Sequence, residues 1–309
     1  MDGQPLTDRF GVVLRPRRPR ALDTLDPREA RDLLREHGAV LFRGFATDPA
    51  DFTRFSDRFG SAYLAHFSPE MDRAPVTVDG IPDALVQTVN LGADGINPHS
   101  EASYSPMCPD FLWFYCATPS RAGGRTLVCD GVEVLGALTE ATRAEYETLE
   151  LRFAVVCPTG YVEALLGAPF AELAARWLHG NARVDYRLED GGETLDFRYA
   201  VPAVPTTRLG GVPTFTNSIL SAMAYRAPDL DRIRAYAPSL SVAALDEAMR
   251  VAHARAHALA WEPRDVLLLD NSRVMHGREP FADPARAIYV RMAIDRHRGP
   301  AVRTPQFMK

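Results

Sequence analysis

Strand-like segments lie near both ends of this chain, and most of the helical stretches lie between them. Short extended pieces, broken by Pro, Gly and Asn, occupy about 62–130, and two further strand-like runs follow at 266–277 and 286–295. The middle segment, about 132–260, contains most of the helical periodicity, at 132–150, 161–178 and 239–260. Short apolar runs bounded by turn residues are typical of strands. The pattern predicts one β core whose two halves are far apart in the sequence.

The first 60 residues predict two helices with a strand between them. Asp26-Pro27 is a typical helix start, and Gly38 is a typical stop. The run AVLFRGF at 39–45 predicts a strand. The next helix, within 48–60, spaces its phenylalanines three and four residues apart, as a buried helix face requires: Phe52, Phe55 and Phe59.

Composition excludes several classes of protein. Of 309 residues, 46% are hydrophobic and 24% are charged, which is typical of a globular protein and not of a disordered one. The net charge of −5 gives no general attraction for nucleic acid or anionic lipid. No apolar run is long enough for a membrane span, and the N-terminus does not resemble a signal peptide. The four cysteines form no Cys-x-x-Cys pair. We therefore expect a cytoplasmic protein with reduced thiols.

His99 and Glu101 are the strongest candidates for metal ligands. One residue separates them in NPHSEASYSP, and alternate residues of an extended segment point to the same side. A third ligand has to come from elsewhere, and His276 in VLLLDNSRVMHGREPF is the candidate. Two histidines and one carboxylate on one side of an ion form the facial triad of non-haem Fe(II) oxygenases. The neighbouring Asp270 and Asn271 are interpreted as turn residues or as hydrogen-bonding residues behind the ligands.

These motifs resemble the taurine dioxygenase and clavaminate synthase-like group of Fe(II)/2-oxoglutarate-dependent oxygenases. The resemblance covers most of the chain, in the group's characteristic order. It is carried by three stretches: GAVLFRGF with the Phe-rich helix after it, PHSEASYSPMCPDFLWFYCATPSRAGGRTLVCDG, and WEPRDVLLLDNSRVMHGREPF. Arg264 stands where the group usually has Gly, which should affect only a turn. Glu101 argues against a halogenase, because halogenases of the group leave the carboxylate position empty for halide.

The resemblance implies a mainly β fold with peripheral helices (α+β) around a double-stranded β-helix, the cupin-like jelly roll. We expect a single domain over 1–309, with the jelly-roll core at about 62–130 and 261–296. The mixed helical insertion at about 132–260 would then form a lid.

The resemblance also implies residues for the cosubstrate. Thr126 occupies the position of a threonine that contacts the distal carboxylate of 2-oxoglutarate. An arginine after His276 should pair with the same carboxylate, and Arg286 and Arg291 are both candidates. Because they are five residues apart, they face opposite sides of a regular strand. We favour Arg291, since it lies in mid-strand, whereas Arg286 follows the Asp283-Pro284 turn.

Substrate-binding residues are less constrained by the sequence. Gln87, Asn90, Tyr104 and Asn217 are candidates for lining a substrate pocket, and Trp113 is interpreted as a core residue. The expected substrate is a small amino-acid-like metabolite, free or tethered to a carrier protein, which is hydroxylated, desaturated or cyclised with Fe(II), 2-oxoglutarate and O2 in bacterial secondary metabolism. A homo-oligomer is compatible with the sequence, and no nucleic acid or membrane partner is expected.

Two alternatives remain at this point. Two histidines and one glutamate also form a catalytic zinc site for hydrolysis, although Thr126 and a downstream arginine have no role in one. A non-enzymatic jelly-roll binding protein is the other alternative, and it would be expected to lack part of the triad.

Overall fold

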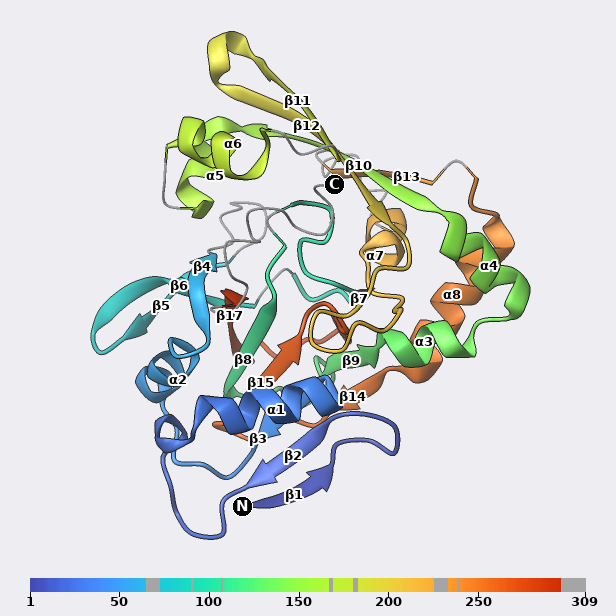
Figure 1. The fold of residues 1–309 in the computed structure, drawn as a ribbon. Coiled ribbons are helices and arrows are strands. Elements are labelled where there is room, and N and C mark those ends of the chain that lie inside the picture. The colour runs from blue at the N-terminus through green and yellow to red at the C-terminus, as the bar shows by residue number, and fades with distance from the viewer. Residues whose placement is uncertain are drawn as a thin grey trace.

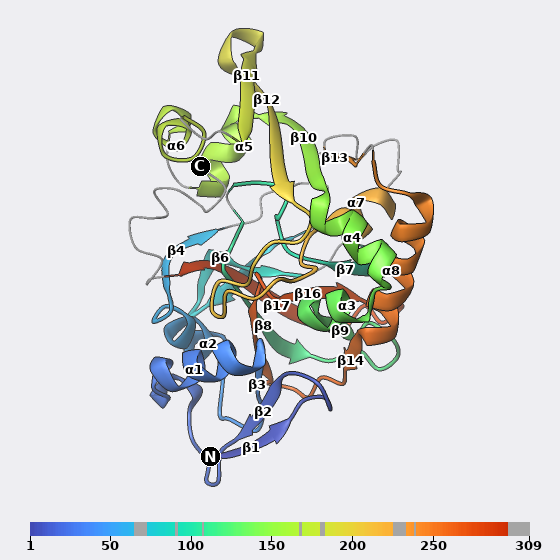
Figure 2. The same ribbon diagram turned by 45° about the vertical axis from the view of Figure 1, so that its right-hand side comes forward.

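The computed structural model describes residues 1–64, 73–89, 92–106, 108–166, 169–179, 183–224, 233–237 and 239–295. Within this part of the chain the structure is mainly β, with strands in three sheets and helices packed around them (Figures 1 and 2). The nine-stranded sheet and one of the two four-stranded sheets form the core that carries the candidate site. No helix of the described residues is long and apolar enough to cross a membrane.

The largest sheet has nine strands and joins both ends of the chain. It contains β1 (Asp2–Pro5), β2 (Val12–Arg15), β3 (Ala39–Phe42), β15 (Val266–Asp270), β8 (Phe111–Thr118), β17 (Ala287–Asp295), β6 (Ile81–Thr88) and β5 (Pro75–Val78), in that order, with β4 (Gly60–Leu64) also paired to β17. The late strands β15 and β17 flank the earlier β8, both antiparallel to it. This pairing confirms that the two halves of the core are distant in sequence.

A smaller sheet of four strands faces the first. Its order is β14 (His257–Leu259), β9 (Thr126–Asp130), β16 (Val274–Arg278) and β7 (Ile96–His99). The single strand-like run predicted over 266–277 is therefore wrong, although its first part, β15, does share the large sheet with β17. The run divides into β15 and β16 because a turn at 271–273 intervenes, and the two strands lie in different sheets.

Strands β8 and β15 of the large sheet are almost continuously hydrophobic because both of their faces are buried. Along β8, Leu112 and Phe114 face the smaller sheet and pack near its Val128, while Trp113 and Tyr115 face the opposite way. Strands buried on both faces carry apolar residues at every position. The interpretation of Trp113 as a core residue is confirmed, since its side chain is fully buried.

Helices α1 (Pro27–His37) and α2 (Pro49–Ser56) cover the outer face of the large sheet, after the short 3-10 helix η1 (Leu22–Thr24). Asp26 caps the start of α1, and Gly38 ends it with φ 73°, as the sequence predicts. Phe55 and Phe59 pack edge-on against Trp113 at 5.6 and 4.8 Å between ring centroids. These aromatic contacts fix α2 against β8.

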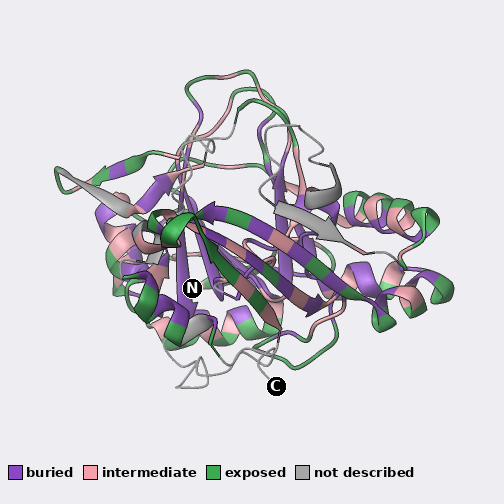
Figure 3. Cartoon of the chain, turned by 90° about the horizontal axis from the view of Figure 1, so that it is seen from above, coloured by how far each residue is buried: buried purple, intermediate pink, exposed green. Residues whose placement is uncertain are grey.

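Residues 131–256 join the two halves of the core. They contain α3 (Gly131–Ala137), α4 (Glu140–Thr148), α5 (Thr159–Leu166), α6 (Phe170–Trp177), α7 (Ile219–Ala224) and α8 (Val242–Arg255). Between these helices lies a third sheet of β11 (Val184–Glu189), β12 (Thr194–Pro202), β10 (Glu150–Pro158) and β13 (Ile233–Tyr236), with the 3-10 helix η3 (Asp190–Gly192) joining β11 to β12. Along β10 and β12 every second residue is buried, which Figure 3 shows as alternating bands. The alternation indicates a sheet with one face against the apolar cluster and one face turned outward.

Candidate metal centre

The pairing of β7 with β16 brings the three predicted ligands together. His99 is the last residue of β7 and lies directly opposite His276 in the ladder. Glu101 follows in the turn after β7 and is 5% exposed. The Nε2 atoms of His276 and His99 lie 3.4 and 3.7 Å from Oε2 of Glu101. Their ligand atoms all lie within 4.8 Å of one another, close enough to share one ion.

A glycine next to His276 allows this close approach. A Cβ atom at Gly277 would lie 2.5 Å from the carbonyl oxygen of Ile96, so any larger residue would push β7 away. The ladder between the two strands is irregular at the same place, between His276 and Arg278. The His-Gly-Arg sequence is therefore required by the geometry of the strands as well as by the chemistry.

The surroundings of both imidazoles suit metal binding. The Nδ1 atom of His99 lies 2.9 Å from the carbonyl oxygen of Asn97, which fixes the ring with Nε2 toward Glu101. Burial, together with the neighbouring His99, lowers the pKa of His276 to about 4. A neutral imidazole is the form that binds metal. The donor set of two imidazole nitrogens and one carboxylate fits Fe(II).

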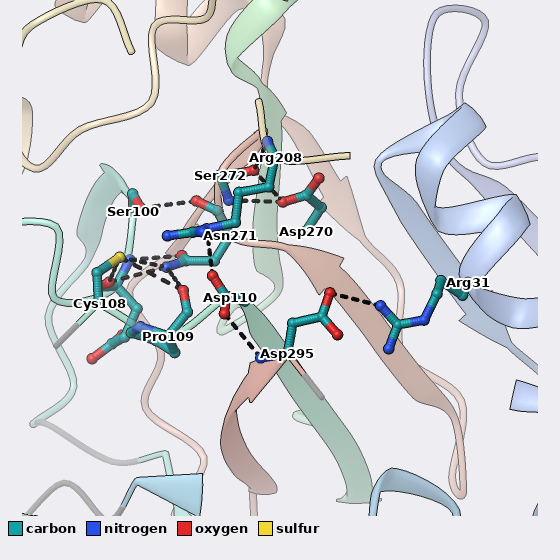
Figure 4. A network of polar contacts seen from close by, with 11 residues as sticks. Arg31, Ser100, Cys108, Pro109, Asp110, Arg208, Asp270, Asn271, Ser272 and Asp295 are labelled. Carbon is teal, nitrogen blue, oxygen red and sulfur yellow. Dashed lines mark hydrogen bonds and ion pairs between the residues drawn. The ribbon is translucent and has the colours of Figure 1, made fainter. Parts of the chain in front are cut away.

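Asn271 holds the peptide groups on both sides of Glu101. Its side-chain oxygen accepts a hydrogen bond from the Glu101 amide at 2.9 Å, and its Nδ2 donates to the carbonyl oxygens of Glu101 and Pro109 at 3.0 and 2.9 Å. The backbone of Asn271 also accepts from the Ser100 hydroxyl and donates to the carbonyl of Asp110. Figure 4 shows these contacts converging on the turn between β15 and β16. The sequence predicts a supporting role for Asn271, but not which residue it supports.

Arg286 lies on the inner side of the large sheet, beside the start of β9. It is 3% exposed, and its Nε donates to the carbonyl oxygen of Gly124 at 2.8 Å. Burial and the charge of Arg278 lower its pKa to about 10. None of the described residues offers it a carboxylate partner. Such a buried, uncompensated cation is suited to bind an anion.

Thr126 follows closely in the chain after Gly124, whose carbonyl oxygen accepts from Arg286. It is the first residue of β9, pairs with Arg278 of β16, and is 4% exposed. Its hydroxyl accepts a hydrogen bond from the indole of Trp261 at 3.0 Å. Its position two residues after Gly124 makes it compatible with the same bound anion as Arg286.

Arg291 faces the other side of the large sheet, contrary to our preference for it as the cosubstrate anchor. Its NH2 lies 2.6 Å from a carboxylate oxygen of Asp57, and its NH1 donates to the Ser56 hydroxyl at 2.6 Å. The guanidinium also lies 3.9 Å above the ring centre of Tyr63. The parity argument holds, since the two arginines contact opposite sides of the sheet. Arg291 connects β17 to the end of α2.

The candidate substrate residues have different surroundings. Gln87 lies on β6 opposite Val290 and is 3% exposed. Asn217 uses both ends of its amide on the backbone, donating to the carbonyl of Ala203 and accepting from the amide of Ile219. Tyr104 is partly buried, with its ring 6.3 Å from that of Phe153. Asn90 lies outside the described residues.

Arg73 is a residue near the centre that sequence reasoning misses. Its side chain is 8% exposed, and its NH2 lies 3.6 Å from Oε1 of Glu101. It belongs to no motif and precedes β5, so only the packing of the chain brings it to the ligands. Arg264, by contrast, is as expected: its φ of 72° shows that a glycine-like turn occurs there.

Comparison with known proteins gives one family. The model of the taurine catabolism dioxygenase TauD, TfdA family matches residues 2–293. A tyrosine isonitrile desaturase from Pseudomonas aeruginosa is 26% identical over 316 aligned positions, which cover 100% of this chain and 94% of that protein.

Two solved structures share the fold. The PvcB protein from Pseudomonas aeruginosa has a TM-score of 0.59 and 21% identity, covering 94% of this chain and 87% of the other. A taurine dioxygenase from Burkholderia xenovorans has a TM-score of 0.62 and 18% identity, covering 95% and 89%.

Proposed function

This chain belongs to the TauD, TfdA family and is an Fe(II)- and 2-oxoglutarate-dependent oxygenase, and we propose that His99, Glu101 and His276 hold its iron. The observation that carries the proposal is the convergence of two imidazoles and one carboxylate from two paired strands. Such a set leaves positions open for 2-oxoglutarate and dioxygen. When bound, the iron and its cosubstrates supply an oxidant for C–H bonds that no side chain provides.

We also propose that the two facing sheets form a double-stranded β-helix and that the chain is a single domain. Support comes from strands of both chain halves alternating within each sheet. Residues of about 132–260 would then be an insertion that covers the site. A cytoplasmic location and a homo-oligomeric state remain predictions.

Arg286 and Thr126 are proposed to bind the distal carboxylate of 2-oxoglutarate. The support is a buried guanidinium that has no carboxylate partner among the described residues and bonds Gly124, together with the buried hydroxyl of Thr126 two residues further on. Arginine binds a carboxylate through two parallel hydrogen bonds and keeps its charge when buried. Arg291 is not proposed for this role, because Asp57 and Ser56 already occupy it.

The proposed substrate is a small amino-acid-derived metabolite in secondary metabolism, free or carrier-tethered. Support comes from the tyrosine isonitrile desaturase relative and from PvcB, described as an Fe, alpha-ketoglutarate dependent oxygenase from an isonitrile synthetic pathway. Hydroxylation, desaturation and cyclisation all begin with removal of a substrate hydrogen. The two alternatives gain no support, because the matched family is a dioxygenase family and all three ligands are present.

A succinate-release screen over amino-acid derivatives tests this function. Substrate-dependent succinate should form with the wild type and be lost in His99→Ala, Glu101→Ala and His276→Ala, because each variant lacks one of three protein ligands. His179→Ala is the matched control, since His179 is exposed, bonds the Tyr186 hydroxyl and is not part of the triad. Normal turnover in any triad variant would remove that residue from the proposed site.

A further inference from the structure

Arg73 and the two histidines approach different oxygens of the same carboxylate. Oε2 of Glu101 faces His276 and His99, whereas Oε1 faces NH2 of Arg73 at 3.6 Å. This separation exceeds the length of an ordinary hydrogen bond. Glu101 therefore only partly compensates the charge of Arg73.

The rest of the Arg73 guanidinium lacks partners. Its Nε and NH1 are buried, and no described residue accepts a hydrogen bond from either atom. A guanidinium remains protonated in proteins, so its charge cannot be relieved by losing a proton. A buried, unpaired cation is costly and requires an anion.

The summed charge of the centre also indicates that a further anion binds there. Iron, Arg73 and Arg286 together bring one more positive charge than Glu101 and 2-oxoglutarate bring negative, even without Arg278. One further anion would balance the centre, and the substrate is the remaining component of the reaction.

We propose that Arg73 binds a carboxylate of the substrate beside the iron. This inference rests on the proposed function. Aromatic side chains lie nearby: Tyr104, whose pKa is raised chiefly by burial and is lowered slightly by the charge of Arg73, has its ring 6.3 Å from that of Phe153. The substrate class is accordingly a small carboxylic acid with an apolar or aromatic body.

Two other roles for Arg73 make different predictions. If it only orients Glu101, its removal weakens Fe(II) binding. If it binds 2-oxoglutarate, its removal weakens cosubstrate binding. If it binds the substrate, both affinities survive and only the preference for acidic substrates is lost.

The test uses a matched pair of probes, 3-(4-hydroxyphenyl)propanoate and 3-(4-hydroxyphenyl)propanamide. Their binding to the Fe(II)- and 2-oxoglutarate-loaded protein is measured by calorimetry without oxygen. The wild type should bind the acid at least about tenfold more tightly than the amide. Arg73→Gln should lose this preference, Arg73→Lys should keep part of it, and Fe(II) and 2-oxoglutarate affinities should change less than about threefold.

Arg152→Gln, an equal charge change on the exposed face of β10, is the control and should keep the preference. Arg73→Gln should unfold at a temperature no lower than the wild type, because it removes a buried cation that Glu101 compensates only in part. The proposal is overturned if the wild type fails to prefer the acid, including if it binds neither probe. It is equally overturned if Arg73→Gln keeps the preference, or loses Fe(II) or 2-oxoglutarate affinity to the same degree. A separate titration measures whether the wild type binds Fe(II) and 2-oxoglutarate. If it binds neither, the proposed function is contradicted, and not the role of Arg73.

Discussion

At the scale of single residues, the metal centre depends on a side chain that never contacts the metal position. Asn271 satisfies the amide and carbonyl of Glu101 and ties them to the turn after β15. A carboxylate held in this way keeps its direction when the metal is absent. Residues that orient ligands typically change metal affinity 10–100-fold when they are mutated.

Asn271→Ala should therefore weaken Fe(II) binding by about 10–100-fold, with an additional loss of roughly 1–3 kcal/mol in unfolding free energy from the unsatisfied peptide groups. Metal titration and urea unfolding measure the two effects. Thr139→Ala, which removes the cap of α4 far from Glu101, should lose about 1 kcal/mol and keep its metal affinity. Equal metal affinity in Asn271→Ala and the wild type would refute the positioning role.

The pH dependence of stability provides a second test at this scale. The pKa of His276 is about 4 in the native protein, below its ordinary value of 6.5, chiefly through burial. Between pH 6.5 and 4 the unfolded chain takes up a proton that the native state does not. The metal-free protein should therefore lose stability as the pH falls through this window.

His276→Gln has no imidazole to protonate at this position, so its unfolding free energy should fall less steeply as the pH is lowered. Between pH 7 and pH 5 the wild type should lose roughly 1–2 kcal/mol more unfolding free energy than His276→Gln loses. Urea unfolding of both metal-free proteins at pH 7 and pH 5 measures the difference. Parallel pH profiles would show that His276 titrates normally.

At the scale of elements, Arg286, directly before β17, and Arg291, within it, have different tasks. The residues facing inward, among them Ile288 and Val290, share their side with Arg286, while Arg291 shares its side with Ala293 and α2. The alternation was predictable from the spacing. The choice of side was not, because it depends on α2 presenting Ser56 and Asp57 to β17, a tertiary contact that no local pattern announces.

Arg286→Ala should raise the dissociation constant for 2-oxoglutarate by roughly 10²–10³-fold, because a buried charge pair loses one partner. Thr126→Ala should have a smaller effect, about 10–100-fold. Arg291→Ala should bind 2-oxoglutarate normally and instead lose about 1–3 kcal/mol of stability, limited because Asp57 is 50% exposed. Titration of 2-oxoglutarate into the Fe(II)-loaded variants without oxygen decides between the arginines. A large loss in Arg291→Ala beside normal binding in Arg286→Ala would reverse the assignment.

At the scale of the whole molecule, the sequence predicts the parts of the centre that lie in motifs. His99 and Glu101 follow from their spacing on an extended segment, and His276 follows from its context. The β core also follows from hydrophobic patterning at the two chain ends. The sequence marks Asp270 and Asn271 as turn residues, but it does not predict that the strands on either side of them lie in different sheets. That depends on β15 pairing with β8 while β16 pairs with β7 and β9. The position of Arg73 beside Glu101 cannot be predicted from the sequence either, because only the packing of the chain brings the two residues together.

The central claim is that these three side chains form an iron site that also takes 2-oxoglutarate. The most direct measurement is anaerobic addition of Fe(II) and then 2-oxoglutarate, followed by visible absorption. The account predicts a weak charge-transfer band in the wild type and its loss in His276→Ala. A wild type without the band, or a His276→Ala variant with the full band, would contradict it.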